Sequence, residues 1–193
     1  MNSSKKFECK LSQHTCLGYD LITKKKCDTK TLIGFEYCNK HLKQFCNLEI
    51  KKSKLYPQAG YGVFASKSIN NGDMIVKYNG EFLDNIEYRI RYKNIYGPYA
   101  VYFNNSNLKK INLLNDGPYS IYFNETHTID SACRRGTASL INHKKKKKGS
   151  NAKYSSKING LFIYAIRDIK EGEEIFADYG DDYLFRKNFK TIN

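Results

Sequence analysis

The chain has 193 residues, enough for one domain of average size or for a small module followed by one domain. Its formal net charge is +14, and 40% of its residues are hydrophobic, including sixteen tyrosines that can help to fill a β-rich core. No run of eighteen apolar residues occurs, which argues against a membrane-spanning helix, and the N-terminus lacks a secretory apolar run. We therefore expect an intracellular protein whose six cysteines are thiols or metal ligands rather than disulfides.

The positive charge is spread unevenly along the chain. Residues 1–56 hold 12 lysines against 5 acidic residues, which gives +7, half of the total excess. By contrast, residues 168–182 hold seven acidic residues and one lysine. The overall basicity suggests an anionic partner such as nucleic acid, although general lysine enrichment explains the total charge equally well. The acidic stretch suggests a basic substrate.

Residues 1–50 have the pattern of a small metal-binding module. Cys16, Cys27 and Cys38 are separated by two ten-residue gaps, and His41 completes a Cys-x-x-His pair. Three thiolates and one imidazole suit tetrahedral zinc, which would stabilise a segment too short to bury a sufficient core. Ordinary buried thiols are the alternative. The sequence does not choose between these ligands and the spare residues Cys9, His14 and Cys46.

A main domain is expected over residues 55–185. Near its start Gly60 and Gly62 flank Tyr61, a pattern that lets backbone approach a ligand at a strand edge, or that forms a simple turn. Strands are expected at 74–78 and 161–166, the second followed by a tight turn at 170–173. Asp84, with Glu87 three residues later, predicts the start of a short amphipathic helix whose apolar face holds Ile86 and Ile90.

An internal repeat lies in the middle of the chain. Its copies are GPYAVYFN at 97–104 and GPYSIYFN at 117–124, each a Gly-Pro turn with an alternating strand. The second copy continues through a turn into residues 127–131, which predicts a hairpin.

Two apolar runs end in polar groups. Residues 138–141 lead into Asn142 and His143, and residues 174–177 lead into Asp178 and Tyr179. A polar group at the end of a buried strand needs a partner or a ligand, so we expect both endings to contribute to one site. The lysines at 144–148 are typical of a solvated loop or of a phosphate-contacting patch.

Four segments in chain order resemble the SET-domain protein-lysine methyltransferases. They are AGYGVFASKSINNGDMIVKYNGE (59–81), IDSACRRGTASLINH (129–143), LFIYAIRDIKEGEEI (161–175) and ADYG (177–180). The resemblance implies a β-rich α+β fold of small twisted sheets, with a pseudoknot that brings the second and fourth segments together. It also implies methyl transfer from S-adenosylmethionine to lysines of a protein, by default a basic histone tail, and hence a nuclear, chromatin-associated location.

The resemblance further implies roles for the matching residues. Tyr179 would be the catalytic tyrosine, and Tyr119 would lie beside the lysine channel, with Tyr99 as the rival if the alignment shifts by one repeat. The residues that would bind the cofactor are Gly60, Tyr61, Gly62, Asn142 and His143. Among them, Asn142 would hydrogen-bond the amino group of the cofactor, and His143 would lie beside its adenine.

The chain also departs from the family pattern. The lysine run replaces a segment that carries a cysteine in relatives, with Asn151 in the place of a second asparagine. No cysteine follows Cys133, so the cysteine-rich segment that many relatives place after their last motif is absent. Something else must then close the lysine channel, and the candidates near the 186–193 tail are Phe185 and Phe189.

Ala177 is the departure that bears on the product. The family usually has Phe or Tyr two positions before the catalytic tyrosine, and this ring limits the number of methyl groups added. Alanine leaves room for more than one methyl group, unless neighbouring Phe176 refills the space.

Two functions from different classes follow from the sequence. The first is a protein-lysine methyltransferase with an N-terminal zinc module. The second is a zinc-containing chromatin or nucleic-acid-binding protein with an inactive SET-like domain and nucleic-acid contacts through its lysine-rich segments. The presence together of Asn142, His143 and Tyr179 favours the enzyme.

Overall fold

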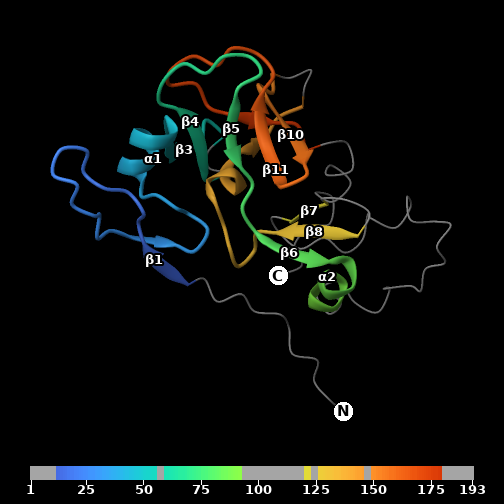
Figure 1. Ribbon diagram of the computed structural model, residues 1–193. Helices are drawn as coiled ribbons and strands as arrows, with labels where there is room; N and C mark the ends of the chain where they lie inside the picture. Colours follow the sequence, from blue (N-terminus) through green and yellow to red (C-terminus); the bar gives the residue numbers. More distant parts are fainter. Residues whose placement is uncertain (1–11, 56–58, 93–119, 123–125, 146–148, 180–193) are drawn as a thin grey trace.

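A computed structural model describes residues 12–55, 59–92, 120–122, 126–145 and 149–179 (Figure 1). Within these residues short strands form four small sheets, accompanied by two short α-helices. This arrangement confirms the expected β-rich α+β class. None of the helices in the described segments has both the length and the apolar character needed to cross a membrane.

The N-terminal part consists of a small hairpin and one helix. Strand β1 (Gln13–Thr15) pairs antiparallel with β2 (Lys30–Leu32), and α1 (Asn39–Cys46) follows. The helix ends at Asn47, which adopts the left-handed conformation at φ 54° and donates its N–H to the carbonyl of Leu42. The side chain of Leu42 is 2% exposed and belongs to the main hydrophobic core.

The next sheet connects this N-terminal part with the rest of the chain. Strand β3 (Leu48–Lys52) pairs antiparallel with β4 (Tyr61–Ala65). Leu48 and Val63 are fully buried in the same core as Leu42, so the two parts share one core. Residue 50, the expected end of the metal-binding module, falls within β3, and the division of the chain into modules stays a prediction.

The largest sheet carries both polar endings. Its strand order is β5 (Met74–Lys77), β11 (Gly160–Ala165), β10 (Ala152–Lys157), β12 (Phe176–Ala177) and β9 (Asn142–His143). The first three strands are antiparallel, whereas β12 pairs parallel with both β10 and β9. Alternate residues of β11 are buried, as expected for a half-buried strand, and they are Leu161, Ile163 and Ala165.

The predicted strands and turns of this sheet are confirmed. The strands expected at 74–78 and 161–166 are β5 and β11, each displaced by one residue at most. In the turn expected at 170–173, Glu173 donates its N–H to the carbonyl of Lys170 at 3.0 Å. Gly172 has a φ of 77° there, a conformation that other residues rarely adopt.

The fourth sheet has the order β6 (Glu81–Asp84), β8 (His127–Asp130) and β7 (Ser120–Tyr122). Strands β7 and β8 pair antiparallel, which confirms the predicted hairpin. The first copy of the repeat lies outside the described residues, as do Tyr99 and Tyr119. Figure 1 shows this sheet beside α2 (Asn85–Tyr92), apart from α1 and β3.

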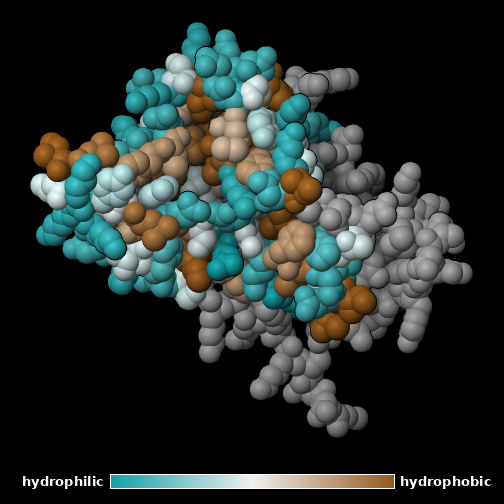
Figure 2. Space-filling model, in the orientation of Figure 1, coloured by the Kyte–Doolittle hydropathy of each residue, from teal (hydrophilic) through white to brown (hydrophobic). Residues whose placement is uncertain are grey.

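Helix α2 begins as the sequence predicts but packs differently. The Oδ1 atom of Asp84 accepts the N–H groups of Ile86 and Glu87, each at 2.8 Å. However, Ile86 is 70% exposed and Ile90 is 66% exposed, so these isoleucines do not form the expected buried face. In Figure 2 hydrophilic residues cover most of the face shown, and separate hydrophobic patches lie near α2 and at the end of the N-terminal hairpin.

One of the two apolar runs is not a strand. Residues Thr137–Leu140 form a 3₁₀ helix, and Ser139 donates both its N–H and its hydroxyl to the carbonyl of Gly136. Ala138 and Ile141 are nonetheless buried. A short apolar run is compatible with a buried strand and with a buried helical turn, which explains the error.

Candidate functional site

The two polar endings lie side by side. In the parallel pair of β9 and β12, Phe176 is opposite Asn142 and Ala177 is opposite His143. The carbonyl of Ala177 accepts the N–H of Lys144 at 3.0 Å, which continues the pairing. The expected meeting of the two endings is therefore confirmed, whereas the chemical roles of their residues stay predictions.

His143 holds the backbone of the second ending. Its Nδ1 atom accepts the N–H of Tyr179 at 3.0 Å, and the two rings are 5.1 Å apart. In this contact the Nδ1 atom is the hydrogen-bond acceptor, and it fixes the backbone of Tyr179 next to the end of β9. The carboxylate of Asp178 lies 4.0 Å from the same Nδ1 atom.

Tyr179 lies at the end of a row of tyrosines. Its hydroxyl donates a hydrogen bond to the carbonyl of Ile141. The ring of Tyr154 meets it edge-on at 6.0 Å, and the ring of Tyr78 meets Tyr154 edge-on at 6.0 Å. Tyr154 was not among the residues predicted from the sequence, although its position opposite the buried residue Ile163 in the β10–β11 hairpin marks it as inward-facing.

Gly60 and Gly62, on either side of Tyr61, differ in the physical constraint that favours glycine. Gly60 has a φ of 65° and open space where a side chain would stand. A Cβ atom on Gly62 would lie only 2.2 Å from Oε1 of Glu174 and 3.2 Å from Nδ2 of Asn142. Gly62 therefore makes room for a buried carboxylate of the protein itself. Tyr61 is 58% exposed, and its carbonyl accepts the Asn142 amide at 2.9 Å.

Glu174 is the central polar residue that the sequence analysis missed. Only 1% of it is exposed, yet it lies in the run that reads as an apolar strand. Its Oε1 atom accepts hydrogen bonds from the Ser53 hydroxyl at 2.7 Å and from the Asn142 amide at 3.2 Å. Its Oε2 atom accepts the backbone N–H of Lys54 at 2.7 Å.

Other carboxylates of the acidic stretch are also used inside the protein. Glu173 pairs with Arg167, and this hydrogen-bonded partner lowers the pKa of Glu173 to about 2. It also accepts a hydrogen bond from the Asn151 amide at 3.2 Å. Asp168 accepts the N–H of Asn71 at 2.8 Å. These contacts leave fewer carboxylates to attract a basic substrate than the sequence suggests.

A buried ion pair supports the segment before the 3₁₀ helix. Asp130 is fully buried, and its Oδ2 atom lies 2.8 Å from Nη1 of Arg91, which also contacts Glu81 at 2.6 Å. Burial alone would lower the pKa of Arg91, but the hydrogen bonds with Glu81 and Asp130 outweigh it and raise the pKa. The pair ties α2 to strands β6 and β8.

The structure describes only some of the residues expected to affect the number of methyl groups added or to close the lysine channel. Ala177 is fully buried within the main core. Phe176 is 5% exposed, and Nζ of Lys144 lies 4.7 Å from its ring centre. The expected channel-closing residues Phe185 and Phe189 lie outside the described residues.

The four metal ligands expected from the N-terminal spacing form one cluster. The ligand atoms of Cys16, Cys27, Cys38 and His41 all lie within 4.8 Å of one another. Nδ1 of His41 is 3.4 Å from the Sγ atoms of both Cys16 and Cys38. Tetrahedral zinc, with bonds of about 2.3 Å to sulfur and 2.0 Å to nitrogen, requires nitrogen–sulfur separations of about 3.5 Å. The donor set and its spacing fit zinc.

The surroundings of the cluster support the same conclusion. Sγ of Cys16 accepts the backbone N–H groups of Gly18 at 3.3 Å and of Cys38 at 3.1 Å, contacts that stabilise a thiolate. A Cβ atom on Gly18 would lie 2.2 Å from the His41 ring, so only glycine lets the loop close over the histidine. The alternative ligands His14 and Cys46 are not part of the cluster, and Cys9 lies outside the described residues. Cys133 is disulfide-bonded, so the expectation that all six cysteines are thiols or metal ligands is wrong for this residue.

Comparison with known protein families identifies the main domain. The SET domain model matches residues 60–180, more than half of the chain. The chain belongs to the SET domain family.

Curated SET domain relatives agree with this assignment. The chain is 32% identical over 149 residues to the variant-silencing SET domain-containing protein of Plasmodium falciparum (isolate 3D7), covering 76% of the chain and 5% of the relative. It is 29% identical over 130 residues to the histone-lysine N-methyltransferase EZH2 of Chaetomium thermophilum, covering 64% and 8%. It is 29% identical over 129 residues to the N-lysine methyltransferase KMT5A-B of Xenopus laevis, covering 63% and 33%. The chain thus spans a third or less of the length of each.

Solved structures give the same result for the fold. The structure resembles the Chaetomium thermophilum polycomb repressive complex 2 in an autoinhibited conformation bound to S-adenosylmethionine, with a TM-score of 0.52 and 25% identity. This match covers 74% of the chain and 17% of the other chain. A humanized mutant of the same complex bound to the inhibitor GSK343 gives a TM-score of 0.52 and 26% identity over 70% of the chain and 15% of the other. The SET-type fold expected from the sequence is confirmed.

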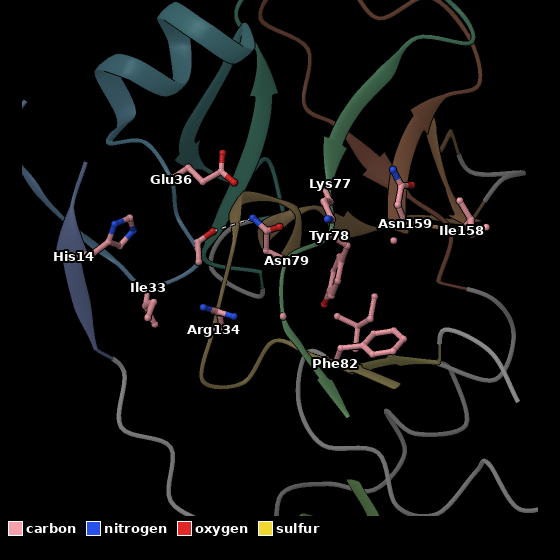
Figure 3. Close-up of a pocket in the computed structure, with 14 residues that line it drawn as sticks. His14, Ile33, Glu36, Lys77, Tyr78, Asn79, Phe82, Arg134, Ile158 and Asn159 are labelled. Atoms are coloured by element: carbon pink, nitrogen blue, oxygen red, sulfur yellow. Dashed lines mark hydrogen bonds between the residues drawn. The ribbon is translucent and has the colours of Figure 1, made fainter. Parts of the chain in front are cut away.

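A groove of about 770 Å³ lies between the N-terminal hairpin and the SET domain (Figure 3). His14 and Ile33 border it on one side, and Tyr78 and Phe82 border it on the other. The Asn79 side chain crosses the groove floor and donates a hydrogen bond to the carbonyl of Gly34 at 3.1 Å. None of the expected catalytic or cofactor-binding residues that the structure describes lines this groove.

Proposed function

We propose that this SET domain transfers methyl groups from S-adenosylmethionine to lysine side chains of a protein. The observation that carries the proposal is the meeting of Asn142, His143 and Tyr179, which come from two segments of one five-stranded sheet. Two relatives are named as lysine methyltransferases, and a similar solved structure is bound to S-adenosylmethionine. Tyr61 and Gly62 lie on β4, Gly60 immediately precedes it, and the Tyr61 carbonyl accepts the Asn142 amide, so these three residues would complete the proposed cofactor site.

The proposed reaction forms a bond between the lysine nitrogen and the methyl carbon. The bond between that carbon and the sulfonium sulfur breaks, S-adenosylhomocysteine leaves, and the displaced amine proton passes to water. The bound cofactor would supply the electrophilic methyl group. The protein must align a neutral amine with it, so positioning is the main contribution. An aqueous lysine has a pKa of about 10.4, and an apolar aromatic surround such as the tyrosine row favours its neutral form.

The substrate class and location follow from the same proposal. One relative is named as a histone-lysine methyltransferase, so we propose a basic histone tail as substrate and chromatin as the place of action. The lysine-rich segments at 1–56 and 144–148 would add contacts with nucleic acid.

The Cys16, Cys27, Cys38 and His41 cluster would hold one structural zinc ion. All four positions would be taken by protein ligands, so the ion would stabilise the fold and leave no open position for chemistry.

A labelled-methyl transfer assay with core histones, and with the protein itself as a second substrate, tests the proposal. Tyr179→Phe should remove most transfer activity and leave cofactor binding nearly unchanged, because only the hydroxyl is lost. Tyr164→Phe is the matched control, since Tyr164 lies on the outer face of β11. Equal transfer by Tyr179→Phe and the parent would exclude Tyr179 from catalysis. A parent that neither binds the cofactor nor transfers a methyl group would favour the inactive chromatin-binding alternative.

A further inference from the structure

Three hydrogen-bond donors from distant parts of the chain meet at one buried carboxylate. Glu174 accepts the Ser53 hydroxyl, the Lys54 N–H and one amide N–H of Asn142. The first two donors follow β3, and the third lies on β9. The contact between Ser53 and Glu174 spans 121 residues of sequence.

These contacts decide which way the Asn142 amide faces. An amide side chain has an NH₂ end that donates and an oxygen that accepts. Both protons of Asn142 are used, one by the Tyr61 carbonyl at 2.9 Å and one by Glu174 at 3.2 Å. A flipped amide would place its oxygen against two acceptor oxygens. Its Oδ1 atom therefore remains the free acceptor, with no partner in the described part of the chain.

The two oxygens of the Glu174 side chain accept all three donors, two at Oε1 and one at Oε2. Glutamine at position 174 has the same shape but replaces one acceptor oxygen by an NH₂ group. If that NH₂ group faced Lys54, two N–H groups would oppose each other. If it faced Asn142, the Asn142 amide would have to turn over. Its NH₂ group would then occupy the position that the free Oδ1 acceptor holds in the parent.

The backbone makes space for this arrangement. A side chain at position 62 would overlap with the carboxylate, since a Cβ atom there lies 2.2 Å from Oε1 and 2.9 Å from Cδ of Glu174. Glycine at position 62 is therefore required for the hydrogen-bonded arrangement of Glu174 and Asn142.

We infer that Glu174 is a positioning residue that orients the Asn142 amide, so that its oxygen accepts a hydrogen bond from the amino group of the cofactor. The inference rests on the proposed function, because Asn142 is the residue expected to contact that group. A protonated amino group has only donors, so it binds an amide oxygen and is repelled by an amide NH₂. The negative charge of Glu174, one hydrogen bond away, adds to the attraction.

A measurement on the parent protein tests the orientation without any ligand. Hydrogen exchange of side-chain amide protons by NMR should be slower for Asn142 than for the exposed side chain of Asn71. Equally fast exchange at the two residues would show that the Asn142 amide is not held, and would overturn the inference whatever the protein binds.

Calorimetric titration tests the consequence for ligand binding. The ligands are S-adenosylmethionine and an analogue in which hydrogen replaces the α-amino group. The parent should prefer the complete cofactor by about ten-fold or more, the size expected for a hydrogen bond to a charged group. In Glu174→Gln this preference should fall to within about two-fold while affinity for the analogue changes little. Ser53→Ala, which keeps the carboxylate, should retain the preference.

The outcomes separate the inference from the proposed function. If Glu174→Gln keeps the full preference, or weakens both ligands equally, Glu174 does not position Asn142 for this contact. If the parent shows slow Asn142 exchange but binds neither ligand, the orientation is supported, and both the proposed function and the amino-group contact are overturned. Should Glu174→Gln fail to fold, the exchange measurement on the parent still decides the orientation.

Discussion

Replacing Gly62 with alanine should destabilise the protein through one identified contact. The new Cβ atom would lie 2.2 Å from Oε1 of Glu174, far inside the normal contact distance, and the nearest obstacle is therefore a buried carboxylate. Gly62 pairs with Lys51 between β3 and β4, so a shift of its backbone would also disturb that sheet.

The size of the effect follows from the contacts that must move. Relieving the overlap requires Glu174 to shift by roughly 1 Å, which breaks hydrogen bonds that now measure 2.7 Å, 2.7 Å and 3.2 Å. Hydrogen bonds to charged groups contribute about 1.5–3 kcal/mol each, and partial recovery after the shift leaves a net loss of about 3 kcal/mol. For a chain of this length, that loss should lower Tm by about 6–12 °C.

A double-mutant cycle in urea identifies the cause. Parent, Gly62→Ala, Glu174→Ala and the double variant are compared at neutral pH with zinc present. Glu174→Ala is destabilising by itself, because it leaves the Ser53 and Lys54 donors without their acceptor. In that background Gly62→Ala should cost less than about 0.5 kcal/mol, because the overlapping atoms are gone.

The refuting result is additivity. If Gly62→Ala lowers the free energy of unfolding by the same amount with and without the Glu174 carboxylate, the glycine is needed for another reason. The argument that joins Gly62, Glu174 and Asn142 would then fail.

Three further predictions concern the metal cluster, an ion pair and the product. Purified parent protein should contain one zinc ion per chain, and Cys38→Ser should lose it while Cys46→Ser keeps it; undiminished zinc in Cys38→Ser would place the site elsewhere. Because the pKa of Glu173 is lowered from 4.5 to about 2, its ion pair with Arg167 stabilises the fold above pH 4.5 and is lost as the pH falls to about 2. Arg167→Ala should therefore be less stable than the parent near pH 6, by less than about 1 kcal/mol for this exposed pair, and equally stable near pH 2; a difference that persists in acid would contradict this. Mass spectrometry of modified substrate should show di- or trimethylated lysine for the parent and mainly monomethyl lysine for Ala177→Tyr. This variant should also melt at a lower temperature, because Ala177 is fully buried. A parent that stops at one methyl group with excess cofactor would contradict the proposed role of Ala177.

Local patterns predicted the parts of the structure that depend on local physics. The turn at 170–173, the start of α2 at Asp84 and the strands β5 and β11 follow from turn residues, a capping side chain and buried runs. The metal cluster was also predictable, because the choice of three cysteines and one histidine is itself chemical information. The meeting of the two polar endings required the family resemblance as well, since they are parallel neighbours far apart in sequence.

The errors arose where distant residues decide the environment. In the sequence, Glu174 belongs to an apolar run within an acidic stretch. Its burial depends on hydrogen-bond donors at positions 53, 54 and 142, which the sequence does not place beside it. Ile86 and Ile90 of α2 have helical spacing, but they are 70% and 66% exposed, and Arg91 makes the inward contact with Asp130 instead. Periodicity shows which side chains share a face, but it does not show what lies against that face.

The metal cluster and the proposed cofactor site are connected by a short physical path. His41 and Leu42 are consecutive in α1, one in the cluster and one in the main core, and β3 follows the helix directly. Ser53 comes immediately after β3 and donates to Glu174, which holds the amide of Asn142. If the cluster holds the proposed zinc ion, its removal would release one fixed end of this path and should weaken the orientation of Asn142 as well as the N-terminal fold. The Cys/His cluster would therefore contribute to the architecture of the proposed cofactor site, even though none of its four residues lies in that site.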